Sequence, residues 1–166
     1  MLSIVHSIGW IRERSERRAD RVVAFLDAER PWIFRLALAI VHRTDLAEDV
    51  TQETLLACWK ARHSVRETAA IRGWVRRTLV RQALRQRVSH LAMDGELAAR
   101  GDLAESAAVR AVLASMPASM RAVLALADYE RLSYAEIAAA LEIPEGTVGS
   151  RLHAARAMFR ARWEGQ

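Results

Sequence analysis

The sequence predicts an all-α protein made of two small helical domains joined by a short linker. The chain of 166 residues is rich in Ala, Leu, Arg and Glu, which favour helices, and has only seven glycines and three prolines. Apolar residues recur at helical spacing in two long stretches. Between these stretches, residues 89–104 have weak spacing, two glycines and three acids against one arginine, which is typical of a linker.

The first domain is expected over residues 22–88. Helical spacing begins at Val22, and Thr44–Asp45 is the expected N-cap of a further helix. A last helix is expected from about residue 69, with a core face formed by Ile71, Trp74, Val75, Leu79 and Leu84. Residues 1–21 are charged and irregular, and they predict an N-terminal extension that forms a tail or a loosely held helix.

The charge of the chain is unevenly distributed, although the net charge is +5. Residues 1–90 hold 17 Lys and Arg against 10 Asp and Glu, whereas residues 91–166 hold 8 against 10. A basic balance makes a polyanion such as nucleic acid a plausible partner. The distribution predicts that any surface for nucleic acid is local.

Several classes of protein are disfavoured. Cys58 is the single cysteine, so neither an intrachain disulfide nor a cysteine-rich metal site is expected. Arg35 interrupts the best candidate for a membrane span, and residues 1–10 do not resemble a signal peptide, so we expect a cytoplasmic protein without membrane insertion. The sequence has no recognisable nucleophile–base pair, phosphate loop or metal cluster, and it predicts a protein that is not an enzyme and has no cofactor.

A second domain is expected over residues 105–163, and it contains a helix-turn-helix pattern. Ser133 and Glu136 fit a capping box, and Pro144 breaks the first helix before the second begins. The second helix has a buried stripe at Val148, Leu152, Ala155 and Phe159. Such a pair of helices can place a helix N-terminus in the DNA major groove, but a plain helical hairpin has the same spacing.

Two helices of the first domain carry charged faces. Asp49, Gln52 and Glu53 lie within about one turn, beside Leu56, and form either a polar docking patch or a solvated face. In the next helix, Arg77, Arg81 and Arg85 repeat every four residues, and no acid occurs between Glu67 and Asp94. This stripe favours contact with phosphates over a merely solvated basic face. Trp74 either stacks on a base or belongs to the core.

Both domains resemble those of an RNA polymerase sigma factor of the extracytoplasmic-function (ECF) type. Over roughly residues 105–160, the string SYAEIA, a Pro-x-Gly-Thr-Val turn and SRLHxAR are similar to the fourth sigma domain. In the first domain, Asp49, Gln52, Glu53 and Trp59 fit a D-x-x-Q-E-x-x-x-x-x-W pattern that is typical of the second sigma domain.

The resemblance implies a function in promoter recognition by binding, with the chemistry left to the polymerase. It implies that the second sigma domain docks on the beta-prime subunit of core polymerase and engages the minus-ten element, while the fourth reads the minus-thirty-five element. Partners would be the beta-prime and beta subunits, promoter DNA and an anti-sigma factor. Residues expected at the polymerase are Asp45, Asp49, Gln52, Glu53, Leu56 and Trp59; those expected at DNA are Arg72, Trp74, Arg76, Arg77, Arg81, Arg85, Ser133, Tyr134, Thr147, Ser150, Arg151, His153 and Arg156.

The chain departs from the family pattern at a few positions. Gly149 and Ala154 stand where family members often have a basic residue, and Gly149 weakens a helix. Arg81 and Arg85 replace an Asn and an Asp that are often seen in the second domain. Two alternatives therefore stay open: a DNA-binding regulator that acts without polymerase, and a sigma-like decoy that binds a regulator without starting transcription.

Overall fold

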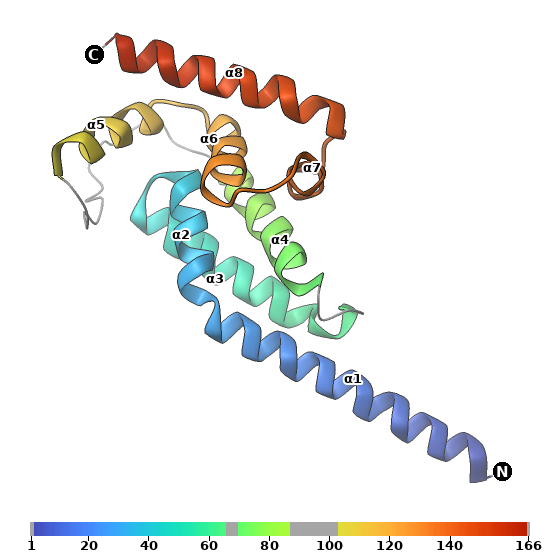
Figure 1. Ribbon diagram of the computed structural model, residues 1–166. Coiled ribbons are helices and arrows are strands. Elements are labelled where there is room, and N and C mark those ends of the chain that lie inside the picture. Colours follow the sequence, from blue (N-terminus) through green and yellow to red (C-terminus); the bar gives the residue numbers. More distant parts are fainter. Residues whose placement is uncertain (1, 66–69, 87–102, 166) are drawn as a thin grey trace.

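The computed structural model describes residues 2–65, 70–86 and 103–165 (Figure 1). These residues form helices and connecting turns, and none of them forms a β-strand. The N-terminal half contains α1 (Leu2–Ala28), α2 (Arg30–Val41), α3 (Thr44–Lys60), η1 (Arg62–Ser64) and α4 (Ile71–Arg85). The C-terminal half contains α5 (Leu103–Ala114), α6 (Ala118–Leu124), the π-helical turn η3 (Ala125–Tyr129), α7 (Tyr134–Leu141) and α8 (Glu145–Glu164). The predicted all-α class is confirmed. Most of the predicted linker, up to residue 102, lies outside the described residues.

The N-terminal half differs from the prediction at two helix starts. The segment expected as a tail or loose helix belongs to α1, which continues through Val22 without a break and buries Ala19, Val22 and Leu26. Figure 1 shows its N-terminal part extending away from the rest of the molecule. Helix α3 begins at Thr44 with Arg43 as its N-cap, and the Asp45 side chain accepts hydrogen bonds from Arg43. The predicted Thr44–Asp45 cap is therefore one residue too late.

The helix-turn-helix is formed by α7 and α8. The predicted capping box of α7 is confirmed: Glu136 N donates to Ser133 Oγ at 3.3 Å, and Ser133 N donates to Glu136 Oε2 at 2.9 Å. Pro144 is the N-cap of α8. Val148, Leu152 and Ala155 are buried as expected, whereas Phe159 is half-buried.

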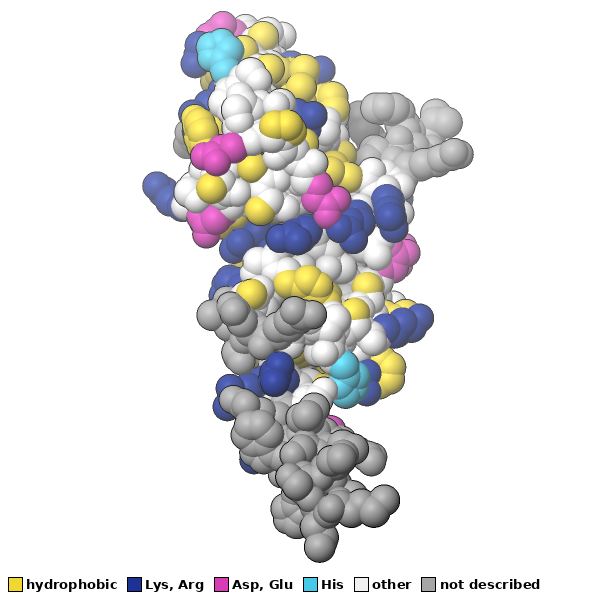
Figure 2. Space-filling view, turned by 90° about the vertical axis from the view of Figure 1, so that its right-hand side faces the viewer, with side chains coloured by type: hydrophobic (Ala, Val, Ile, Leu, Met, Phe, Trp, Pro, Cys, Tyr) yellow, Lys and Arg dark blue, Asp and Glu magenta, His cyan; other side chains and the backbone are white. Residues whose placement is uncertain are grey.

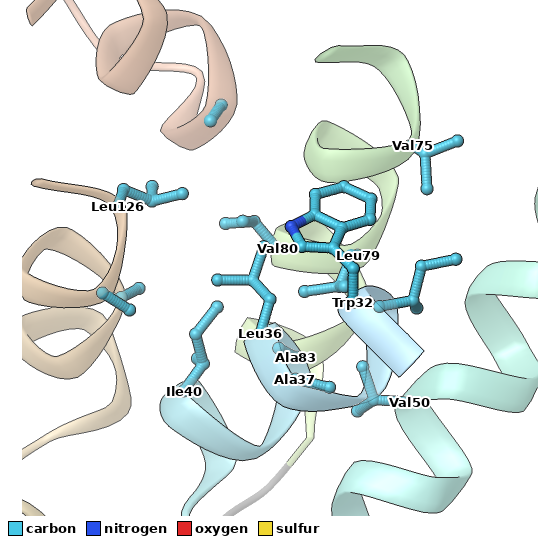
Figure 3. Packing of buried hydrophobic residues seen from close by; sticks show 14 of the residues in the cluster. Trp32, Leu36, Ala37, Ile40, Val50, Val75, Leu79, Val80, Ala83 and Leu126 are labelled. Atoms are coloured by element: carbon cyan, nitrogen blue, oxygen red, sulfur yellow. The ribbon is translucent and has the colours of Figure 1, made fainter. Parts of the chain in front are cut away.

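A single apolar cluster runs through both halves of the chain. It joins Leu36, Ile40 and Val80 of the N-terminal half to Leu126 of η3, which points toward them in Figure 3. Helix α4 contacts α2 and α3 on one side and α6 and α7 on the other. Its core face is consequently wider than predicted: Ile71, Val75, Arg76, Leu79, Val80 and Ala83 are buried. The predicted core residues Trp74 and Leu84 are half-buried and exposed, respectively.

None of the described helices is long and apolar enough to cross a membrane.

Candidate nucleic-acid and polymerase interfaces

The arginines of α4 differ in how accessible they are. Arg77 and Arg85 are exposed. Arg72 Nη1 lies 3.3 Å from Glu29 Oε2, and the guanidinium carbon of Arg72 lies 4.4 Å from the ring centroid of Trp32. Arg81 forms an exposed ion pair with Glu142, the residue that ends α7. All four side chains are exposed, but Arg72 and Arg81 are held in ion pairs, and the partner of Arg81 lies in the other half of the chain.

Arg76 belongs to a polar cluster at the junction of the two halves. Its Nη2 donates to Glu130 Oε2 at 3.2 Å, and Trp32 Nε1 donates to the other carboxylate oxygen at 2.9 Å. The side chains of Arg76 and Glu130 are each only 9% exposed. The expectation that Arg76 belongs to an accessible phosphate-binding face does not hold in this conformation, because the C-terminal half packs over that part of α4.

A groove of about 700 Å³ runs along the boundary between α4 and α7. Its α4 wall includes Arg72, Trp74 and Arg77, and its α7 wall includes Glu136 and Ala139. Figure 2 shows Lys and Arg side chains gathered in a band across this face of the molecule. The half-buried indole of Trp74 is thus accessible beside cations, an arrangement that suits an unstacked base and its phosphate.

The N-terminal part of α8 presents the residues expected at DNA. Ser150, Arg151 and His153 are exposed, and Thr147 is half-buried with its carbonyl accepting a 3.0 Å hydrogen bond from the Ser150 hydroxyl. Tyr134 is 49% exposed. Its ring lies next to Gly149 of α8, because a Cβ added to Gly149 would lie 3.5 Å from Tyr134 Cε2. These side chains form one surface, so the helix-turn-helix geometry is present.

Two of the expected DNA-binding side chains are occupied by contacts within the domain. Arg156 pairs with Asp128 at 2.5 Å. The Ser133 hydroxyl is used in the capping box, where it donates to Glu136 Oε2 at 2.7 Å. That bond and one from the Ser133 backbone lower the pKa of Glu136, with a smaller contribution from the charge of Arg76.

Helix α3 has a buried and an exposed face. Ala47, Val50, Thr51, Thr54 and Cys58 point into the core. Asp49, Gln52 and Glu53 are exposed, as are Leu56 and Trp59, which are 52% and 48% exposed. The Arg62 guanidinium lies 4.3 Å from the Trp59 ring centroid, and hydrogen bonds from Arg43 lower the pKa of Asp45. An acidic, hydrogen-bonding patch next to uncovered apolar side chains is typical of a protein-binding surface.

Sequence reasoning missed two buried polar residues at the junction. Arg121, 2% exposed, donates to the carbonyl oxygens of Ile40 at 2.6 Å and Val41 at 3.3 Å. His42, 9% exposed, donates from Nε2 to the Arg110 carbonyl at 2.7 Å. The one available signal was that Arg121 is the only charged residue between Arg110 and Asp128. Within the described ranges, no cluster of three His, Cys, Asp or Glu side chains is placed to hold a metal ion.

Comparison with known families matches both halves of the chain. Residues 25–90 match Sigma-70 region 2, and residues 106–159 match Sigma-70, region 4. The ECF RNA polymerase sigma factor SigL of Mycobacterium tuberculosis is 31% identical over 144 residues, which cover 78% of this chain and 81% of SigL. The RNA polymerase sigma-H factor of Pseudomonas aeruginosa is 28% identical over 167 residues, which cover 87% of this chain and 86% of that protein.

A chain in which region 2 precedes a region 4 helix-turn-helix is a two-region sigma factor of the sigma-70 type. This protein belongs to the ECF RNA polymerase sigma factor family, as its motifs predicted. The match to SigE of Mycolicibacterium smegmatis, 31% identical, spans only 56% of that protein. The fold is also similar to the sigma factor RpoE solved in complex with the anti-sigma factor NepR from Bartonella quintana, with a TM-score of 0.68 and 21% identity over 84% of this chain and 94% of that one.

Proposed function

We propose that this protein directs core RNA polymerase to specific promoters and initiates transcription there. The observation that carries the proposal is the pairing of two surfaces in one chain: the acidic and apolar face of α3, and the arginines of α4 with the exposed start of α8. A DNA-binding regulator that acts alone has no use for the first surface. The protein would act in the cytoplasm, where polymerase and promoter are found, and by binding alone.

The N-terminal half, with proposed bounds 22–88, would hold the polymerase and the minus-ten element. Asp45, Asp49, Gln52, Glu53, Leu56 and Trp59 would contact the beta-prime subunit through carboxylates, an amide and apolar surface. Along α4, the exposed Arg77 and Arg85 would contact phosphates first because they take no part in the ion pairs that hold Arg72 and Arg81. Trp74, at the edge of the α4–α7 groove, would stack on a base once the duplex opens.

The C-terminal half, with proposed bounds 105–163, would read the minus-thirty-five element. The N-terminal part of α8 would enter the major groove, where Arg151 and His153 can reach base edges and phosphates. Thr147, Ser150 and Tyr134 would contact the backbone alongside them. An anti-sigma factor is the proposed regulator, covering the surfaces that polymerase and DNA would use.

Run-off transcription with purified core polymerase and promoter fragments tests the proposal. We expect discrete, promoter-dependent transcripts with the wild-type chain and their loss in the Asp49→Ala/Gln52→Ala variant, because that variant loses two polar groups of the polymerase face. Glu164→Ala, which removes one exposed acid at the far end of α8, is the control and retains transcription. Core binding without transcripts at several promoters would favour a decoy. No binding to core polymerase would leave a DNA-binding regulator as the better account.

A further inference from the structure

Helix α4, the helix proposed to contact promoter phosphates, is partly covered by the C-terminal half of the same chain. Three acids of that half lie near its arginines: Glu130 after the π-helical turn, Glu136 in α7, and Glu142 at the end of α7. Glu130 pairs with Arg76 and Glu142 with Arg81, while Glu136 lies across the groove from α4. All three belong to the half of the sequence in which acids outnumber Lys and Arg.

The backbone at Glu142 supports a specific role for its side chain. Its φ of 55° lies in the left-handed region, and its N–H donates to the Ala138 carbonyl as the cap of α7. Glycine is the usual residue at such a position because it has no Cβ penalty there. A glutamate in its place has a backbone cost, and here its carboxylate reaches an arginine 61 residues away in the sequence.

A carboxylate and a phosphate accept hydrogen bonds from the same guanidinium N–H groups, because each offers two oxygens that the planar guanidinium can contact side by side. The N–H groups of Arg76 and Arg81 that face Glu130 and Glu142 are therefore not available to a DNA phosphate in this conformation. Arg76 and Glu130 are 54 residues apart along the chain, and Arg81 and Glu142 are 61 residues apart. Each pair joins the two halves, so both pairs form only when the halves are docked.

We propose that the C-terminal half competes with DNA for α4 inside the free protein, with Glu130 and Glu142 in the places of phosphates. This proposal rests on the proposed contact between α4 and DNA. The docked form is a stable state because the junction also has an apolar centre at Leu126 and a buried guanidinium, Arg121, bonded to the end of α2. Binding to polymerase and promoter then has to separate the two halves and release Arg76 and Arg81.

Binding of a fluorescent single-stranded DNA oligonucleotide to the full chain, without polymerase, measures the competition. We expect Glu142→Gln to bind roughly twofold to threefold more tightly than wild type, because an exposed ion pair contributes little. Glu130→Gln/Glu142→Gln should bind roughly tenfold more tightly, because the buried pair is also lost. Glu48→Gln/Glu164→Gln has the same change of net charge, on exposed residues of α3 and α8 that take no part in the Glu130 or Glu142 pairs, and serves as the matched control.

Small-angle X-ray scattering and circular dichroism give the structural readout. The double variant should have a larger radius of gyration than wild type and an unchanged helix signal. If the buried Glu130→Gln change prevents folding, Glu142→Gln at the exposed rim still tests the competition. Oligonucleotide affinity equal to that of the matched control in the folded variants would overturn the proposal.

One further pair of variants separates this proposal from the proposed function. Arg77→Gln/Arg85→Gln removes two exposed cations of α4 that take no part in the Glu130 or Glu142 pairs. If this change weakens oligonucleotide binding while the glutamate variants bring no gain, α4 contacts DNA and only the competition fails. If it has no effect on binding in any background, α4 does not contact DNA and the proposed function loses its minus-ten surface.

Discussion

Arg121 is a buried charged residue whose loss should destabilise the fold. Its guanidinium donates to the carbonyl oxygens of Ile40 and Val41 in α2 and of Met116 before α6. Arg121→Ala leaves these buried carbonyls without donors, so we expect the free energy of unfolding to fall by about 3 kcal/mol in urea denaturation. Arg151→Ala, an exposed arginine of α8, should change it by less than about 0.5 kcal/mol. Equal effects of the two changes would contradict the role given to Arg121.

His42 makes the stability of the docked halves depend on pH. Burial lowers the pKa of its imidazole, the Arg110 carbonyl opposes this, and the charges of Arg121 and Arg110 lower the pKa further. The unfolded chain therefore takes up a proton near pH 6.5 that the folded chain does not, and stability is lost as the pH falls below that value. Urea denaturation at pH 7.5 and 5.5 should show a larger loss for wild type than for His42→Gln, whose amide can still donate to Arg110. Equal losses would contradict the assignment.

At the scale of one residue, sequence patterns located exposed groups better than buried ones. The spacing of Asp49, Gln52 and Glu53 placed them on one exposed face because an α-helix has a fixed period. The same period placed Arg76 on a basic face, yet it is buried against Glu130. The periodicity of one helix gives no information about a partner 54 residues further along the chain.

Helix α7 is held at its start by the capping box of Ser133 and Glu136. Ser133→Ala removes the acceptor for the Glu136 N–H, and we expect the free energy of unfolding to fall by about 1 kcal/mol. Ser133→Asp provides a carboxylate acceptor in the same place and should retain most of the stability. Chemical denaturation of the two variants beside wild type measures this, and an Asp variant as unstable as the Ala variant would argue against capping.

Gly149 lowers the stability of α8 without a steric need for glycine. A Cβ there would meet only Tyr134 Cε2, at an ordinary contact distance of 3.5 Å. Gly149→Ala should therefore raise the free energy of unfolding by about 0.5–1 kcal/mol, through helix propensity and a less flexible unfolded chain. Thermal denaturation followed by circular dichroism checks it, and a lower melting temperature would show that the Tyr134 ring cannot accept the methyl group.

At the scale of the element, helices with local start and stop signals were predictable. The capping box and Pro144 delimit α7 and α8 through bonds and clashes within a few residues. Helix α1 was not foreseen as one element, because eight of the ten residues from Arg12 to Arg21 are charged and interrupt the apolar spacing along the helix. The π-helical turn at Ala125–Tyr129 has no local signature either, although it directly precedes Glu130.

At the scale of the whole molecule, the docking of the two halves could not be predicted from sequence patterns. Family motifs and helical spacing predicted two domains separately, and both match known sigma regions. Their junction is built from pairs far apart in the chain, such as Trp32 with Glu130 and Arg81 with Glu142. Such pairs depend on the relative orientation of the halves, which no local pattern encodes.

The shared core predicts that the halves unfold together. Leu126 of η3 is fully buried and points toward Leu36, Ile40 and Val80 of the N-terminal half (Figure 3). Leu126→Ala leaves a cavity between the halves, so we expect a loss of about 3 kcal/mol. Because the cavity borders α4, amide hydrogen exchange should accelerate in α4 as well as in α6, although the change lies in neither helix.

Ala substitution at Leu152, buried in α8, which packs against α5, α6 and α7, is the matched control. It removes the same side-chain atoms from a site packed within the C-terminal half, so its effect on exchange should be larger in α7 and α8 than in α4. If Leu126→Ala accelerated exchange in the C-terminal half alone, the halves would be independent folding units in contact. Acceleration in α4 would instead mean that the proposed separation of the halves at a promoter requires breaking part of the protein's own core.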